Sequence, residues 1–357
     1  MARRLVLLVA LGALASLPAP RGAAAAGVPP AFFGVVSQAG LSNEDFERMQ
    51  GVVGTLRVGF DWGAVEPRPG ETDYASLDAV VGAASEHGIR LLPILSGRPA
   101  WLHLGPSGSP VSTTEAAAAW RRFVAGVAAR YGPGGEFWRQ PGLSRVTPIR
   151  LWQIDNEPNF RLYWPHPSPA QYARQLRIAA RVLHRLDPGA RIALAGLAPV
   201  SAGLPTWTFL RRLYRIPGVR RDFDLVALHP YSWTTFQLGY QVRRIRRVMS
   251  EFGDGRTPLL ISELGVSSGG PVPSAFDLGP RGQARFLTRA FRLLIAQRHR
   301  WRIAGVSWFS WQDVSYVEEH CSFCQRSGLV DALGHPKLSW GAYRRLVEKA
   351  RSASLAP

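Results

Sequence analysis

The chain has 357 residues, a length that is ample for a large hydrophobic core and would permit one or two domains. Its 43 basic side chains exceed its 25 acidic ones, which gives a formal net charge of +18. Two cysteines are too few for a zinc site built from four.

The basic clusters Arg243-Arg244, Arg246-Arg247 and Arg298 to Arg302 fall on or at the ends of predicted outer helices. We expect solvated helix surfaces and no nucleic-acid partner, because no run of arginines alternates with stacking aromatic residues on a strand face. A weak, non-specific attraction to anionic cell-envelope polymers stays open as an alternative.

The first 26 residues have the features of a secretory signal peptide. Arg3-Arg4 precede an apolar run from Leu5 to Leu17, and small residues follow at Ala24-Ala25-Ala26. The run is too short to span a bilayer as a mature helix, and no later segment reaches membrane length without charges. We therefore predict a signal peptide over residues 1–26, cleavage, a secreted, extracellular protein and no integral membrane segment afterwards. The alternative is an uncleaved anchor.

Eight short, nearly continuous apolar segments predict strands that are buried on both faces. They are Ala31–Ser37, Val53–Phe60, Ile89–Leu95, Ile149–Asp155, Ile192–Leu197, Leu225–His229, Leu259–Glu263 and Ala304–Phe309. A helical pattern follows each of them. Eight alternations of strand and helix predict a parallel sheet closed on itself, a (β/α)8 TIM barrel, as a single catalytic domain over residues 27–357.

Local signals mark several of the helix ends. Gly88 is placed to end the second helix, Ser112 with Glu115 reads as a capping box that opens the third, and Ser168-Pro169 opens the fourth. The seventh helix is predicted from about Gln283 to Gln297.

In such a barrel the loops after the strands hold the site. The longest are Gly97–Ser112, Asn156–Pro167, Pro199–Trp207 and Gln312–Ser327, and they are rich in Pro, Gly and Trp. Aromatic faces in these loops suit the apolar faces of sugar rings. The tryptophans near strand ends are Trp62, Trp101, Trp164, Trp207, Trp233, Trp308 and Trp311. For each of them except Trp308, plain packing is the alternative.

Two of the predicted strands end in a glutamate. The fourth runs into Asn156-Glu157-Pro158, and the seventh ends at Glu263. Two carboxyl groups at strand ends are the minimal equipment for cutting a glycosidic bond, one as acid and the other as nucleophile.

These motifs resemble the retaining glycosidases of glycoside hydrolase clan A, and further motifs are similar to families 39 and 42 of that clan. The further motifs are Asp61-Trp62, Glu66-Pro67, Gly88-Ile89-Arg90-Leu91-Leu92-Pro93, Pro99-Ala100-Trp101, His229-Pro230-Tyr231, Trp308 with Asp313, and Gly328-Leu329-Val330-Asp331. The match spans roughly residues 31 to 346. One departure is Asp155, where the family usually has Trp.

The resemblance implies a role for each matching residue. Glu157 would be the acid/base and Glu263 the nucleophile, with their carboxyl groups about 5–5.5 Å apart. Asn156 would bond the 2-hydroxyl of the sugar, and Tyr231 would donate to Glu263. Arg57 would hold Glu263 charged, and the alternative is an ion pair with Asp155.

His229, Trp308 and Trp101 complete the residues that are expected to line the substrate site. For His229 the alternative is a hydrogen-bonded strand-end histidine without a role in binding. No cofactor and no metal ion are expected, and the partner is a carbohydrate substrate. Cys321 and Cys324 are expected to form a local disulfide, with free thiols or a redox pair as alternatives.

Three functions fit this pattern. The first is a secreted retaining β-glycosidase acting on a polysaccharide or glycoconjugate, and the second is a barrel that binds glycans without cutting them. A transglycosylase would use the same two glutamates.

Overall fold

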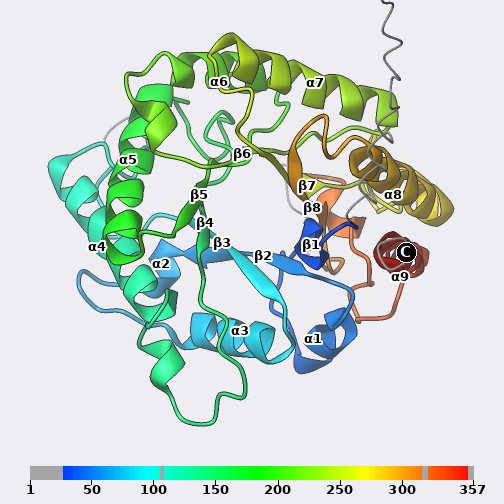
Figure 1. Ribbon diagram of the computed structural model, residues 1–357, viewed down its shortest axis with the longest axis horizontal. Helices are drawn as coiled ribbons and strands as arrows, with labels where there is room; N and C mark the ends of the chain where they lie inside the picture. Colours follow the sequence, from blue (N-terminus) through cyan, green and yellow to red (C-terminus); the bar gives the residue numbers. More distant parts are fainter. Residues whose placement is uncertain (1–26, 105–107, 316–320, 353–357) are drawn as a thin grey trace, which may run out of the picture.

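The computed structural model describes residues 27–104, 108–315 and 321–352 and forms a ring of eight parallel strands surrounded by helices (Figure 1). The strands are β1 (Phe33–Val36), β2 (Thr55–Asp61), β3 (Arg90–Ser96), β4 (Leu151–Ile154), β5 (Arg191–Ala193), β6 (Val226–Leu228), β7 (Leu259–Leu264) and β8 (Ile303–Phe309). All eight predicted strands are present, and the predicted (β/α)8 TIM barrel is confirmed.

Pairing runs in the order β5-β4-β3-β2-β1-β8-β7-β6. The ring closes between β5 and β6 through the isolated parallel bridges Ala193–Leu225 and Leu197–Leu228. The amide of Leu194 also donates to the carbonyl of Leu225 at 2.9 Å. Because only single bridges join this edge, β5 and β6 are shorter than the sequence predicted.

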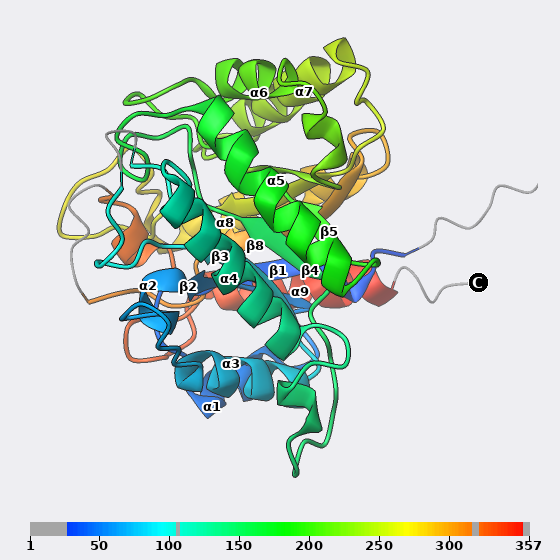
Figure 2. The same cartoon turned by 90° about the vertical axis from the view of Figure 1, so that its left-hand side faces the viewer.

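Nine α-helices lie in the described part of the chain, most of them covering the outside of the sheet (Figure 1). They are α1 (Asn43–Met49), α2 (Trp62–Val65), α3 (Ala75–Glu86), α4 (Thr114–Tyr131), α5 (Pro169–Leu186), α6 (Thr206–Tyr214), α7 (Thr235–Glu251), α8 (Gly279–Ala296) and α9 (Leu338–Ser352). Short 3-10 turns are at Pro30–Phe32, Phe137–Arg139, Val219–Arg221 and Cys324–Arg326. Figure 2 shows α4 and α5 lying side by side along one flank. None of these helices is both long enough and apolar enough to cross a bilayer.

Two helix starts differ from the prediction. The hydroxyl of Thr113, not that of Ser112, caps α4 by accepting from the amide of Ala116, so Glu115 falls one position short of a capping box. Helix α8 begins at Gly279, four residues before Gln283, because Pro280 is compatible with a first helical turn. Ser168 and Pro169 open α5, and Gly88 follows α3 with a φ of 69°, both as predicted.

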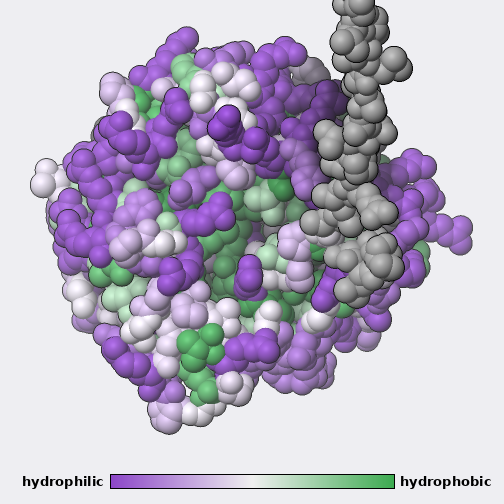
Figure 3. Space-filling view, in the orientation of Figure 1, coloured by the Kyte–Doolittle hydropathy of each residue, from purple (hydrophilic) through white to green (hydrophobic). Residues whose placement is uncertain are grey.

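The barrel has a different opening at each end. Figure 3 looks onto the end where the strands begin, and apolar residues lie in the hollow at its centre. This cavity, of about 680 Å³, is lined by residues such as Leu92, Leu151, Leu225 and Leu260. The ends of β4 and β7, with their glutamates, lie at the opposite face.

Candidate active site

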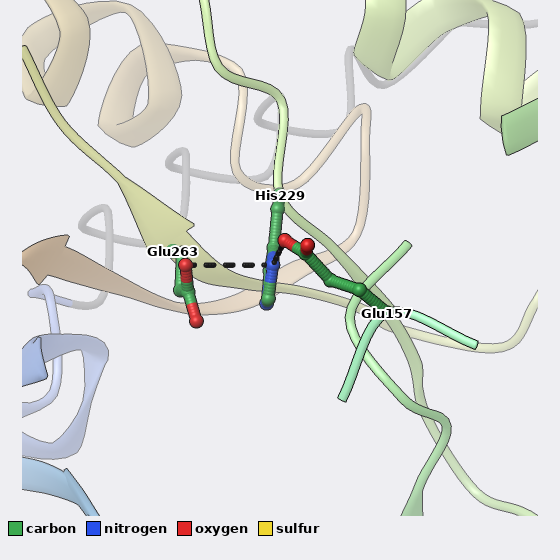
Figure 4. A group of neighbouring side chains, drawn as sticks. All are labelled: Glu157, His229 and Glu263. Atoms are coloured by element: carbon green, nitrogen blue, oxygen red, sulfur yellow. Dashed lines mark hydrogen bonds and ion pairs between the residues drawn. The ribbon is translucent and has the colours of Figure 1, made fainter. Parts of the chain in front are cut away.

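Both predicted glutamates line one cavity of about 570 Å³ at the end of the barrel where the strands finish. Glu157 follows β4 and Glu263 lies within β7. One oxygen of each carboxyl group and the Nδ1 atom of His229 lie within 4.8 Å of one another. Figure 4 shows the imidazole of His229 between the two carboxyl groups.

The backbone after β4 is bent sharply to present this site. Asp155 has a φ of 67° and Glu157 a φ of 44°, both in the left-handed region. That conformation costs a residue with a side chain about 1–2 kcal/mol. Strained backbone of this kind clusters at functional sites, where the surrounding structure holds it. Here the amide of Glu157 donates to the carbonyl of Gly196 at 3.2 Å.

Arg57, on β2, makes contacts with three residues in and around the site. Its Nη1 lies 2.5 Å from Oε1 of Glu263, its Nη2 donates to Oδ1 of Asn156 at 2.8 Å, and its Nε donates to Oε1 of Gln153 at 2.6 Å. The side chain is 1% exposed, and these partners offset the cost of burying a charge. Arg57 therefore contacts Glu263 and not Asp155, which settles the two alternatives.

Tyr231 donates to the other oxygen of Glu263, Oε2. Burial, together with the charge of Glu263, raises the pKa of the Tyr231 hydroxyl well above its usual value, so it stays a donor. A guanidinium on one oxygen and a phenol on the other thus fix the orientation of the Glu263 carboxyl group.

The environment of Glu157 differs from that of Glu263. Burial raises the pKa of its carboxyl group well above the usual value, and the nearby charge of Glu263 raises it further, while Arg57 acts in the other direction. The raised pKa suits Glu157 to the role of the acid that glycoside hydrolysis requires beside a second carboxyl group.

His229 contacts both carboxyl groups, at 2.6 Å from Oε1 of Glu157 and 3.5 Å from Oε2 of Glu263 (Figure 4). Burial, with a smaller contribution from Arg57, lowers the pKa of its imidazole well below the usual value, so the ring is neutral. Its Nε2 is buried and has no hydrogen-bond partner in the described part of the chain. A buried N–H without an acceptor is rarer than a buried acceptor without a donor. We therefore place the proton on Nδ1, which donates to Glu157.

Asn156 lies beside these groups and lines the cavity. Its Oδ1 is held by Arg57, and no described residue accepts from its amide nitrogen, so the NH2 group is available to a ligand. Asp155 does not pair with Arg57. Its Oδ2 accepts from the indole of Trp164 at 3.1 Å, and its Oδ1 accepts from the amide of Asn156 at 2.7 Å.

Two residues that were predicted to contact the substrate, Trp308 and Trp101, are not among those that line the cavity. Trp308 is fully buried and donates to the carbonyl of Ser327 at 3.0 Å, and its neighbour Phe309 lines the cavity instead. Trp101 lies outside the cavity lining, packs edge-on against Trp62 at 6.3 Å and donates to the carbonyl of Glu66.

Aromatic residues do line the cavity, but none of the seven tryptophans named above is among them. The lining aromatic residues are Phe160, Tyr163, Tyr231, Phe276, Phe309 and Phe323. The loop after β7 supplies Ser274 and Phe276, which the sequence did not single out because no motif marks that loop. Val36, at the end of β1, and Ser37 and Gln38, which follow it, also line the cavity and also lack a motif.

Cys321 and Cys324 are bonded to each other in the loop after β8, as predicted, and both line the cavity. Phe323, between them, packs against Tyr231 at 5.1 Å and Phe276 at 4.7 Å. The disulfide loop is therefore a wall of the site.

No family model matches the chain, and no curated protein matches it. Solved structures do share its fold. A glucosidase from Croceicoccus marinus has 17% identity and a TM-score of 0.64, over 90% of this chain and 68% of that one. A GH39 enzyme from Xanthomonas axonopodis pv. citri has 20% identity and a TM-score of 0.65, over 90% and 67%. A GH5_18 structure from Streptomyces cattleya in complex with GlcNAc has 16% identity and a TM-score of 0.65, over 88% and 76%.

At these identities the likeness shows the fold. The expected similarity to family 39 is confirmed at that level, with family 5 beside it, whereas the similarity to family 42 stays a prediction. The chain thus has the barrel fold that glycoside hydrolases of families 39 and 5 share.

Proposed function

We propose that the protein is a secreted retaining β-glycosidase that hydrolyses a polysaccharide or a glycoconjugate by double displacement. The observation that carries the proposal is the close approach of Glu157 and Glu263, with an oxygen of each within 4.8 Å, across one cavity. Carboxyl pairs in retaining glycosidases are about 5–5.5 Å apart, against about 6.5–9.5 Å in inverting ones. The spacing here favours retention.

In the first step Glu263 attacks the anomeric carbon while Glu157 gives its proton to the departing glycosidic oxygen. The bond between the anomeric carbon and that oxygen breaks, and an ester to Glu263 forms. The hydrogen bond from His229 occupies Oε1 of Glu157, which leaves Oε2 to carry the proton that is transferred.

In the second step Glu157, now a carboxylate, takes a proton from water as the water attacks the same carbon and releases Glu263. Two inversions give net retention. Asn156, whose carbonyl oxygen Arg57 holds, is positioned to bond the sugar through its NH2 group.

Glu157, His229 and Glu263 also have the spacing of metal ligands. The donors already on the carboxyl oxygens argue against that use. Arg57 lies 2.5 Å from Oε1 of Glu263, where its positive charge would repel a cation, and Tyr231 donates to Oε2. Hydrolysis is therefore expected to be unchanged after exhaustive treatment with a chelator.

The test of the mechanism compares two variants on aryl β-glycosides. Glu263→Ala is expected to abolish turnover. Glu157→Ala is expected to lower kcat/KM by about 10²–10⁴-fold for poor leaving groups and far less for good ones, which need no proton. Proton NMR of the first product should show the β-anomer. Full activity of Glu263→Ala, or an α-product, would overturn the proposal.

Export rests on the signal-peptide features, which lie outside the described residues, and is supported by the disulfide. Expression of the full chain in a secreting host, followed by N-terminal sequencing of protein from the medium, tests it. Processing near Ala26 is expected, and retention of the whole chain inside the cells would contradict export.

A further inference from the structure

Trp233 lies next to the active-site cavity, at its rim. Its ring packs edge-on against Phe276 at 5.4 Å, and Phe276 lines the cavity and contacts Tyr231 at 6.4 Å. Tyr231 in turn donates to Glu263. Two ring contacts therefore connect Trp233 with the residue that holds Glu263. Although it is large and apolar, Trp233 is 43% exposed.

A separate groove of about 270 Å³ begins at Trp233, on the outside of the barrel. It runs between the starts of α7 and α8, which are neighbours in Figure 1. Its lining residues are Trp233, Thr234, Thr235, Leu278, Gly282, Arg285, Phe286 and Arg289. The cavity and the groove share a wall, because Phe276 faces the first and Leu278 the second.

The groove carries positive charge that the described residues leave unpaired. Arg285 and Arg289 are exposed, and neither makes an ion pair or a hydrogen bond with a described residue. With Arg281 they form an exposed row one helical turn apart on α8. Like charges at this spacing destabilise a helix, and among the described residues no acidic side chain lines the groove to offset them.

The neighbouring groove between α6 and α7 is different, although it is lined by Arg211, Arg243, Arg244 and Arg247. Arg211 makes two hydrogen bonds of 2.9 Å to Glu251, and Arg244 lies over the ring of Trp207 at 3.5 Å. Part of this charge already has protein partners. The groove at Trp233 combines unpaired arginines with an exposed aromatic platform next to the cavity.

We propose that this groove is a distal subsite for an acidic sugar, so that the substrate is a glycan bearing carboxylate or sulfate groups. One sugar of the chain is held at Glu157 and Glu263, and the chain crosses the rim over Phe276 and Trp233. The acidic group of a more distant sugar lies between Arg285 and Arg289. Guanidinium groups suit this task, since they bind carboxylates and sulfates through paired N–H donors. This inference rests on the proposed function in taking the occupant of the cavity to be a sugar.

Binding measurements distinguish this subsite from attraction to the net positive charge of the protein. They are made on the Glu263→Gln variant, which leaves the probe uncut. The probes are fluorescent oligogalacturonate, dextran sulfate oligomers and neutral dextran oligomers of the same length. Arg285→Gln/Arg289→Gln is expected to weaken binding of an acidic probe at least fivefold. The acidic probe that is affected identifies carboxylate or sulfate as the ligand. Trp233→Ala should weaken it as well, through lost stacking.

The matched control is Arg243→Gln/Arg247→Gln, which removes the same charge from the other side of α7 and should leave the affinity within about twofold. Equal losses in both double variants would mean attraction to net charge alone and would overturn the inference. So would unchanged binding in Arg285→Gln/Arg289→Gln, with folding of every variant checked by circular dichroism. Hydrolysis of a neutral aryl glycoside by the unsubstituted protein tests the proposed function separately. If that hydrolysis occurs and the groove variants bind normally, only the subsite is wrong.

Discussion

At the scale of single residues, the pKa of the Glu157 carboxyl group determines how catalysis depends on pH. Because burial and the charge of Glu263 raise its pKa, the group is expected to hold its proton above pH 4.5 and to lose it as the pH rises further. For a glycoside with a poor leaving group, kcat/KM should therefore fall as the pH passes through that raised pKa. With a leaving group that departs without a proton the same fall should be much weaker. Parallel pH profiles for the two substrates would contradict the role of Glu157 as acid.

The raised pKa of Glu157 also predicts how the stability of the fold depends on pH. The folded protein binds the Glu157 proton more tightly than the unfolded chain, whose ordinary pKa is 4.5. The contribution is fully present below pH 4.5 and is lost as the pH rises through the folded value. The free energy of unfolding of the wild type, relative to Glu157→Gln, should fall over that window. Urea unfolding of both proteins at a series of pH values measures it, and a difference that stays constant would refute the raised pKa.

Gly196 is the residue that makes room for His229. A Cβ added there would lie 1.8 Å from Nε2 of the imidazole, closer than any real contact. Gly196→Ala should displace the ring from the two carboxyl groups, lowering both kcat and the melting temperature. Gly40→Ala is the control, because nothing lies within 4 Å of its added Cβ. Activity retained in full by Gly196→Ala would show that His229 has no part in positioning Glu157.

The disulfide loop after β8 acts at the scale of an element. Since the bond between Cys321 and Cys324 closes a very short loop, its contribution to stability should be modest, and the barrel should survive reduction. The loop also holds Phe323 against Tyr231, so Cys321→Ser/Cys324→Ser should change KM more than the melting temperature. The native protein should weigh two hydrogens less than the reduced chain. Alkylation of both cysteines without prior reduction would contradict the bond.

Strand periodicity shows which segments are strands but not, at their ends, which side chain faces inward. Successive residues of a strand point to opposite faces, so a shift of one residue exchanges them. That is the difference between Trp308, which is buried against the helices, and Phe309, which lines the cavity. Trp101 lies outside the cavity lining for another reason, since its indole donates to the carbonyl of Glu66, which follows α2. Glu157 and Glu263 were predictable because each ends a recognisable strand, whereas Asn156, Tyr231 and Arg57 were predictable only from the resemblance to clan A.

At the scale of the whole molecule, the eightfold alternation of strand and helix was enough to predict the barrel, because each buried parallel strand leaves a continuous apolar segment. The walls of the site were less predictable. Phe276 and Phe323 meet at 4.7 Å although they lie in loops after different strands, and only the closed barrel brings those loops together. Trp233 was visible in the sequence as an aromatic residue near a strand end, but its groove depends on the packing of α7 beside α8.

At the same scale, the net charge predicts how hydrolysis depends on salt. The formal charge of +18 is carried mainly by arginines on the outer helices, whereas Arg57, the arginine that lines the cavity, is buried and paired. Salt at physiological strength screens exposed charges beyond about 8 Å and affects a buried pair much less. Hydrolysis of a small neutral aryl glycoside should therefore change less than about twofold between low and high salt. A steep loss on this neutral substrate would mean that the outer arginines act on the cavity itself, and a loss confined to acidic polymers would agree with the subsite at Trp233.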